Sequence, residues 1–400
     1  MTLYGKLEEE IYMEQPEGFH ARGKERHILW LRHALYGLKQ PDLAWWQALK
    51  KSMEELGFVN LDSDAGLFKC FDEASQTFII AVVYVDDAIF LGLSKPAVEV
   101  MKKRFMERWE SRDLGELKEF LHMRIGRAGQ SIYIDQAQYL QTMLQQCGMV
   151  NAKAVPTPLP VGYAPVKSLD KAADPELWKR YQTVIGSLLY LMLGTRPDIL
   201  FAVTKMAQFA ANPMEDHLSH ALYICRYLVG TPNYRLRYDG ASGQGLNACT
   251  DSDWASDVNT WRSTSGYSIK LAGGLISWTT KAQKTVALSS TEAEYMALSD
   301  CSRQVVWMHT IMGELGYSFK PIPICGDNQG SIFIASNPVT ERRSKHIDIR
   351  YHYIREVISR KYACVFFING DQNPADMFTK NLGSVKFLKY WGELGLEFLE

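Results

Sequence analysis

Apolar and polar positions divide the first part of the chain into short elements. Residues 78–85 form an unbroken apolar run rich in β-branched and aromatic side chains, and its short length indicates a buried strand rather than a helix. Asp86 and Asp87 interrupt the run, and residues 88–92 resume it. The pattern predicts a β-hairpin with two acids at its turn.

The middle part has a helical pattern that lies between two breaks in regular structure. Several prolines make residues 155–165 unsuitable for a helix or a central strand, and the glycine-rich residues 240–245 indicate a flexible turn. Between them, apolar residues recur at helical spacing in three stretches, which are residues 177–193, 199–211 and 216–229. We therefore predict a helical connection between two other domains.

The last part of the chain alternates strand and helix signals. After Leu246 the pattern predicts three consecutive strands, a long helix, a fourth strand, two helices, a fifth strand and a final short helix. The long helix covers residues 291–315, the helix before the fifth strand covers residues 346–361, and the final helix covers residues 374–378. This order predicts a mixed sheet of about five strands flanked by helices.

Four separated acids fall at the ends of these predicted elements. Two Mg²⁺ ions that clamp the attacking and leaving oxygens of a phosphodiester need several hard carboxylates held by rigid elements. The order of the elements is compatible with such a site. The four acids, at the first strand, the long helix, the fourth strand and the last helix, are Asp251, Glu292, Asp327 and Asp376.

Three of these acids also have a purely structural explanation. Glu292 fits a capping box begun by Ser289. Asp327 fits a cap of the helix that follows it, and Asp376 complements the dipole of the last helix. Asp251 is harder to explain in this way, because Asp is disfavoured in strands. The order of the elements leaves both interpretations open.

The composition is that of a globular protein with more than one domain. The chain has 400 residues, 46% of them apolar, which exceeds what one hydrophobic core usually serves. Its formal net charge of -1 gives no overall basic field, so any nucleic acid would be bound by local patches. The scattered cysteines lack zinc-site spacing, and no apolar run is long enough to span a bilayer. We expect a soluble, intracellular protein without structural zinc.

The main local basic patch lies where the helix of residues 346–361 is predicted to begin. Lys281 and Lys284, shortly before the long helix, are two further candidates for contact with nucleic-acid phosphates. A solvated helix face is the alternative for the patch. The cations of the patch are Arg342, Arg343, Lys345 and His346, with Arg350 and Arg355 further along the predicted helix.

The last part of the chain contains six distinctive motifs, which are residues 248–255, 262–267, 286–295, 327–329, 345–352 and 375–380. Together they closely resemble the RNase H domain of copia-type LTR retrotransposons. The resemblance implies that Asp251, Glu292, Asp327 and Asp376 are the D-E-D-D metal-binding set of that family. Asp253, Glu294 and Asp371 lie nearby without matching it.

The resemblance continues upstream into the reverse transcriptase and connection of copia-type Pol. It implies that Asp86 and Asp87 are the hairpin pair of the polymerase palm, and that Gln40 lies near the path of the nucleic acid. The motifs here are residues 35–40, 84–87, 113–117 and 226–232.

One departure from the family pattern concerns the polymerase. The third palm aspartate lies, in the family, in a stretch upstream of the glutamate-rich segment that residues 7–19 match, and the chain begins after that point. We therefore expect a fragment, a degenerate element or an internal start, and a chain of these residues that does not extend a primer.

Together these features predict a multi-domain α+β fold with three parts. Residues 1–155 would be a truncated reverse transcriptase with palm and thumb, residues 156–243 a connection and residues 244–400 an RNase H-like domain. The resemblance implies two Mg²⁺ ions, which Mn²⁺ would replace, and RNA/DNA hybrid, RNA template and DNA primer as partners. It places the protein in the cytoplasm, in a virus-like particle, or in the nucleus. The alternative is a relic that binds nucleic acid without catalysis.

Overall fold

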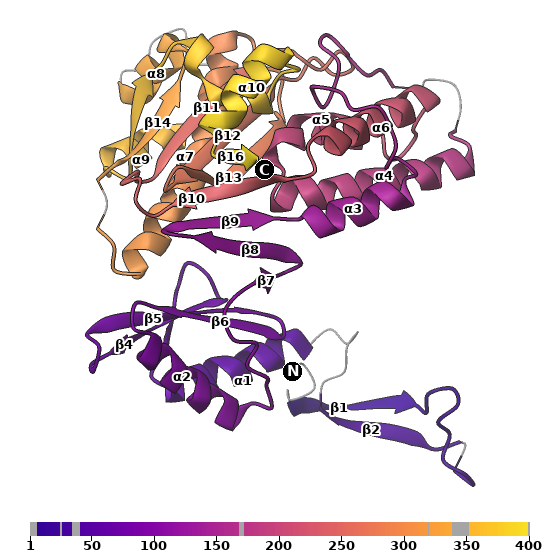
Figure 1. Cartoon of the computed structure of the whole chain (residues 1–400), viewed down its shortest axis with the longest axis vertical. Coiled ribbons are helices and arrows are strands. Elements are labelled where there is room, and N and C mark those ends of the chain that lie inside the picture. Colours follow the sequence, from indigo (N-terminus) through magenta and orange to yellow (C-terminus); the bar gives the residue numbers. More distant parts are fainter. Residues whose placement is uncertain are drawn as a thin grey trace. The chain divides into compact units, whose positions relative to one another are not determined.

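The computed structural model describes residues 6–24, 26–33, 41–167, 172–318, 320–337 and 352–398. The chain forms two compact units (Figure 1). The first comprises residues 1–117 and 310–317, and the second comprises residues 118–309 and 318–400. In the parts that the structure describes, no helix is both long and apolar enough to cross a bilayer.

The first unit is built on a four-stranded antiparallel sheet in the order β3-β4-β5-β6. Its strands are β3 (Val59–Asn60), β4 (Leu67–Asp72), β5 (Thr77–Tyr84) and β6 (Asp87–Gly92). The predicted hairpin is confirmed, because β5 pairs with β6 up to Tyr84 and Asp87.

Two helices complete this unit. Helix α1 (Pro41–Glu55) and helix α2 (Lys95–Arg108) supply large apolar side chains to a core that includes Phe68 and Ile79 of the sheet. A separate antiparallel hairpin is formed by β1 (Lys6–Glu14) and β2 (Ile28–His33).

The second unit contains the predicted mixed five-stranded sheet, in the order β13-β12-β11-β14-β15. Strand β12 runs antiparallel to both β11 and β13, whereas β14 is parallel to both β11 and β15. The predicted α+β fold is therefore confirmed. The strands are β11 (Asn247–Asp253), β12 (Thr264–Leu271), β13 (Gly274–Ala282), β14 (Ile322–Gly326) and β15 (Ala363–Phe367).

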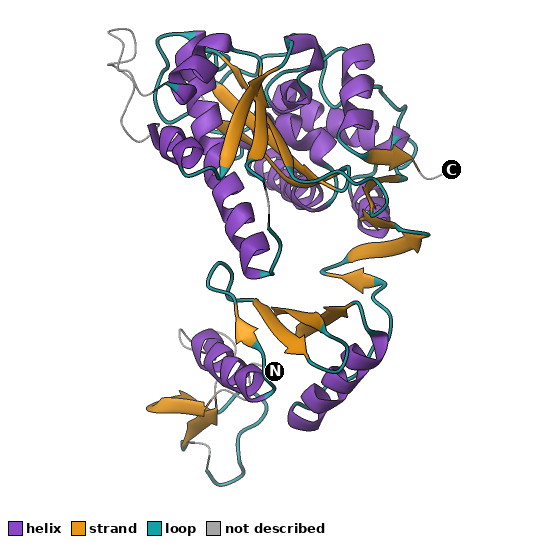
Figure 2. Cartoon of the chain, turned by 90° about the vertical axis from the view of Figure 1, so that its left-hand side faces the viewer, coloured by secondary structure: helices purple, strands orange, loops and turns teal. Residues whose placement is uncertain are grey.

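Helices flank this sheet, and Figure 2 shows its strands among them. The long helix α7 (Ser290–Glu314) agrees with the prediction, whereas the helix predicted for residues 346–361 is described only as α9 (Tyr353–Ser359). The predicted last helix is a 3₁₀ turn, η6 (Pro374–Phe378), after a shorter turn η5 (Gly370–Gln372). The remaining helices are α8 (Gln329–Ser336) and α10 (Ser384–Glu393).

The predicted connection is helical, as expected, and packs into the same unit. Its elements are α4 (Pro175–Gly194), η2 (Pro197–Ile199), α5 (Leu200–Ala207) and α6 (Glu215–Gly230). These helices share one core with η6 and α10, which contribute Phe378 and Tyr390. The connection and the mixed sheet are therefore one packed body.

A second five-stranded sheet, which the sequence did not predict, also belongs to this unit. Its order is β16-β10-β9-β8-β7. The predicted boundaries at residues 155 and 243 fall inside the unit, because β10 pairs with both β9 and β16. The three-part division stays a prediction. The strands are β7 (Glu119–Phe120), β8 (Met123–Ala128), β9 (Ser131–Asp135), β10 (Tyr234–Asp239) and β16 (Leu396–Phe398). Helix α3 (Ala137–Gln146) follows β9 in the chain.

Candidate metal centre

Two of the predicted acids are positioned by adjacent parallel strands. Asp251 lies near the end of β11, and its side chain is buried. Asp327 directly follows β14, whose residues Ile324 and Cys325 pair with Ala248 and Cys249 of β11. Because the two strands run parallel, both carboxylates lie at the same edge of the sheet.

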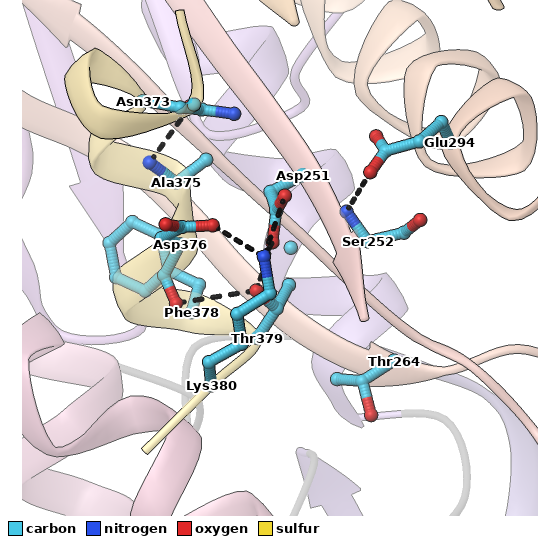
Figure 3. A network of polar contacts seen from close by, with 12 residues as sticks. Asp251, Ser252, Thr264, Glu294, Asn373, Ala375, Asp376, Phe378, Thr379 and Lys380 are labelled. Atoms are coloured by element: carbon cyan, nitrogen blue, oxygen red, sulfur yellow. Dashed lines mark hydrogen bonds and ion pairs between the residues drawn. The ribbon is translucent and has the colours of Figure 1, made fainter. Parts of the chain in front are cut away.

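The third acid, Asp376, is brought to this edge by η6. Asn373 caps the turn by accepting a hydrogen bond from the Ala375 N–H (Figure 3). Its Nδ2 donates to the Thr250 carbonyl at 2.9 Å. Gly266, the register partner of Asp251, permits this approach, since a Cβ there would lie 2.8 Å from the Phe378 Cβ. The absence of a side chain at Gly266 thus allows η6 to pack closely onto β12.

These three carboxylates form a group that fits a divalent cation. Asp251, Asp327 and Asp376 each offer one carboxylate oxygen, and these oxygens lie within 4.8 Å of one another. Hard oxygen ligands of this kind are those that Mg²⁺ and Mn²⁺ prefer. The residues present therefore fit the metal that the sequence predicts.

Burial and repulsion between neighbouring carboxylates shift the pKa values of this group. Burial raises the pKa of Asp251 to about 7, Lys380 opposes this shift, and the neighbouring Asp376 and Asp327 add to it. Burial also raises the pKa of Asp327. Concentrated negative charge is therefore costly here, and a cation that neutralises it would stabilise the fold.

Two lysines supply part of that neutralisation within the chain. Lys380 Nζ lies 2.6 Å from Asp376 Oδ1 and 3.3 Å from Asp251 Oδ2, between the two carboxylates (Figure 3). Lys386 Nζ lies 2.6 Å from Asp376 Oδ2. Burial alone would lower the pKa of Lys380, but its contacts with Asp251 and Asp376 raise it. The Thr379 hydroxyl also donates to Asp251.

The structure gives the two glutamates near the start of α7 different contacts. Glu292 Oε2 accepts the Leu288 N–H at 2.7 Å, and the Glu292 N–H donates to Ser289 Oγ at 3.1 Å, so this residue caps the start of α7. Glu294, two residues later, reaches β11 instead and accepts the Ser252 N–H at 3.1 Å (Figure 3). The capping contacts that the sequence allowed for Glu292 are therefore present, and its assignment to the metal-binding set stays a prediction.

Glu294 interacts electrostatically with two of the aspartates, Asp251 and Asp327. Burial raises its pKa to about 9, and Asp251 and Asp327 contribute to the shift. Glu294 precedes the buried residues Leu298, Cys301 and Val305 at helical spacing. Position 294 thus lies on a buried face of the helix.

The remaining predicted site residues lie outside this centre. Lys281 at the end of β13 and Lys284 just after it are exposed. Asp86 and Asp87 are exposed at the β5–β6 turn of the first unit. The other predicted contacts fall outside the described residues, and they are Gln40, Arg342, Arg343, Lys345, His346 and Arg350.

Comparison with known proteins gives matches over nearly the whole chain. Residues 1–161 match the family described as "Reverse transcriptase (RNA-dependent DNA polymerase)". The chain is 37% identical over 392 residues to "Retrovirus-related Pol polyprotein from transposon TNT 1-94" of Nicotiana tabacum, covering 96% of this chain and 29% of the relative. It is 35% identical over 396 residues to the Pol polyprotein from transposon RE1 of Arabidopsis thaliana, covering 98% and 27%.

Among solved structures, "LC11-RNase H1 in complex with RNA/DNA hybrid" is 14% identical, with 34% of this chain and 93% of that chain covered and a TM-score of 0.26.

These matches indicate the class of protein. Residues 1–161 match the reverse transcriptase family, and the similarity to Pol polyproteins continues through the rest of the chain. More particularly, nearly the whole chain is similar to Pol polyproteins of retrotransposons, which agrees with the resemblance that the motifs indicated. It spans less than a third of the length of these relatives.

Proposed function

We propose that the second unit is a ribonuclease H that hydrolyses the RNA strand of RNA/DNA hybrids. The observation that carries this proposal is the approach of Asp251, Asp327 and Asp376 to within 4.8 Å of one another. Glu294 would complete the set of four carboxylates, in place of Glu292. The Pol family supports a nucleic-acid substrate.

The four carboxylates would hold two divalent cations, Mg²⁺ or Mn²⁺. When bound, such a pair activates a water molecule for in-line attack on an RNA phosphate and stabilises the leaving 3′-oxygen. The chain's own part is to hold the carboxylates rigidly: Asn373 fixes η6 against β11, and the Ser252 N–H orients Glu294. Choice of a hybrid over duplex DNA would rest on contacts with 2′-hydroxyl groups in the minor groove.

Lys380 and Lys386 would stabilise the carboxylate group before the cations bind. Each forms a short ion pair with Asp376, so each competes with a cation for that carboxylate. They would keep the carboxylate group together before the cations bind, because opposite charge offsets the repulsion among the acids.

The test is cleavage of a labelled RNA/DNA hybrid by the full chain with Mg²⁺. We expect cleavage that excess chelator stops, and little cleavage of single-stranded RNA or duplex DNA. Asp376→Asn should remove it, whereas Asp371→Asn is a matched control, because the Asp371 side chain is 91% exposed. A chain that binds the hybrid without cutting it would support the relic instead.

The first unit carries a second candidate activity. The match of residues 1–161 to reverse transcriptases, with the acids Asp86 and Asp87 at a hairpin turn, supports a palm that takes part in polymerisation on an RNA template from a DNA primer. This activity is proposed for the longer Pol protein. The test is primer extension by a longer Pol chain, measured with and without the substitution Asp86→Asn. We expect the substitution to abolish primer extension.

A further inference from the structure

A cavity of about 270 Å³ lies beside the carboxylate group, inside the second unit. Three segments line it: the linker of residues 159–165, the helix α5 and the loop after β11. Lys380, which contacts Asp251 and Asp376, also lines it. A group bound in this cavity would therefore lie next to whatever the carboxylates bind.

Lys205 of α5 is the second ammonium group at the cavity. It is only 9% exposed and lies in a helix whose neighbouring residues Ala202, Val203 and Met206 are buried in the core. Its Nζ lies 5.6 Å from the centre of the Phe201 ring. Within the described part of the chain, no hydrogen bond or ion pair from this Nζ is present. A buried cation placed at a cavity without such a partner has the means to bind an anion.

Within the described part of the chain, neither Asp253 nor Asp257 forms a hydrogen bond or a close ion pair with this lysine. Asp257 accepts hydrogen bonds from the Asn259 N–H, the Asn259 Nδ2 and the Thr260 hydroxyl, so its carboxylate is hydrogen-bonded within its own loop. Burial raises the pKa of Asp253, the last residue of β11, although Lys380 and Lys205 oppose this shift. Burial lowers the pKa of Lys205, while Asp257 and Asp253 act in the opposite direction.

We propose that this cavity binds a backbone phosphate of the nucleic acid, with Lys205 as a contact supplied by the connection. The cavity is smaller than most pockets for whole ligands, which suits one phosphate with part of its sugar. Ammonium groups are common ligands of phosphates. The inference rests on the proposed function, since the occupant is the same strand that the carboxylate group would cut or its partner strand.

The test is the salt dependence of hybrid binding, with Ca²⁺ replacing Mg²⁺ so that binding is measured without cleavage. Lys205→Gln removes the charge, Lys205→Arg keeps it, and Lys179→Gln is the matched control, because Lys179 is exposed on the neighbouring helix α4. One lost phosphate contact reduces the slope of log K against log salt by about 0.9, so between about 50 and 200 mM KCl the parent should lose about threefold more affinity than Lys205→Gln. Lys205→Arg and Lys179→Gln should keep the parental slope.

A second variant avoids any change in the core. Gln208→Glu adds a negative charge at the rim of the cavity, and Gln208 is exposed, so the fold should tolerate it. It should weaken hybrid binding severalfold at low salt. Parental binding by this variant together with a parental slope for Lys205→Gln would overturn the inference.

The outcomes separate this inference from the proposed function. If Lys205→Gln lowers the melting temperature but keeps the slope, Lys205 is only a counter-ion of Asp253 and Asp257, and the inference is wrong. If the parent binds the hybrid with the expected difference in slope but does not cut it, the inference holds and the ribonuclease assignment fails. If the parent does not bind the hybrid at all, both fail.

Discussion

Glu294 accepts a hydrogen bond from the backbone N–H of Ser252 at 3.1 Å. This contact joins α7 to β11 one residue after Asp251. It brings the Glu294 carboxylate close enough to Asp251 and Asp327 for both to raise its pKa, although Glu294 and Asp251 are far apart in the sequence. The same contact separates the roles of two glutamates that lie in the first turns of one helix.

The two glutamates provide a matched pair of variants. We predict that Glu294→Gln lowers metal-dependent cleavage of an RNA/DNA hybrid by orders of magnitude, because it removes a carboxylate from the proposed site. Glu292→Gln should leave cleavage within a fewfold of the parent, since Glu292 caps α7. Initial rates at several Mg²⁺ concentrations measure both. The opposite ranking would restore the assignment made from the sequence.

These two glutamates show what the sequence patterns leave open. The motif contains both residues, both are buried, and a capping pattern and a metal site both favour acids near a helix start. The choice depends on which turn of α7 faces β11, and tertiary packing decides this. By contrast, the hairpin of β5 and β6 follows from local patterning alone, and the prediction agrees with the structure to within one residue at each end.

A second prediction concerns the close packing of η6 on β12. Gly266→Ala should lower the free energy of unfolding by about 1–3 kcal/mol, because the new methyl group would meet the backbone turn at Phe378 and Thr379. It should also weaken Mg²⁺-dependent cleavage, since it moves the turn that carries Asp376. Gly186→Ala in α4 is the control, with open space around the added Cβ. Equal denaturation midpoints for the two variants would contradict this account of Gly266.

Long-range pairing was the other feature that local patterns could not supply. Strand β16 is only three residues long and pairs with β10, and β10 pairs with β9. Such pairs form across large sequence separations, so neither partner has a local signal that identifies the other. Lys205 is a similar case, because a lysine in an apolar helix is normally expected to face solvent.

A third prediction follows from the raised pKa values in the metal-free chain. Asp251 has its pKa raised to about 7 and Glu294 to about 9, so the folded state binds these protons more tightly than the unfolded state. The stability that they contribute is complete below their unfolded pKa values and is lost as the pH rises through about 7 and about 9. The melting temperature without metal should therefore fall by several degrees across this window.

Added Mg²⁺ should raise the melting temperature more above pH 7 than below pH 6, because a cation binds the ionised carboxylates. Glu294→Gln should flatten the upper part of the pH dependence, since it removes the group that titrates there. Melting curves from pH 5 to 9 measure both effects. If Glu294→Gln followed the parental curve throughout, the proton bound by Glu294 would not be linked to folding.

The last prediction concerns a buried ion pair in the connection. Arg196 and Asp198 have side chains that are 2% and 0% exposed, and Arg196 Nη2 lies 2.7 Å from Asp198 Oδ2. Arg196 also donates to the carbonyl and hydroxyl of Thr231, and the Tyr227 hydroxyl donates to Asp198. The four residues join η2 to the end of α6, so the pair connects two helical segments of the core.

Asp198→Asn keeps the shape of the side chain but leaves the Arg196 charge buried without its counter-ion. Removing one partner of such a pair costs about 3–5 kcal/mol, so the denaturation midpoint of the second unit should fall strongly. Glu356→Gln breaks an exposed ion pair with Arg360 on α9, where the cost should be below about 1 kcal/mol. Urea denaturation followed by tryptophan fluorescence compares the two variants. The Asp198→Asn chain should still cut the hybrid at low temperature, because the pair stabilises the connection and lies outside the carboxylate group; a loss of cleavage in a fully folded variant would mean that the connection shapes the centre itself.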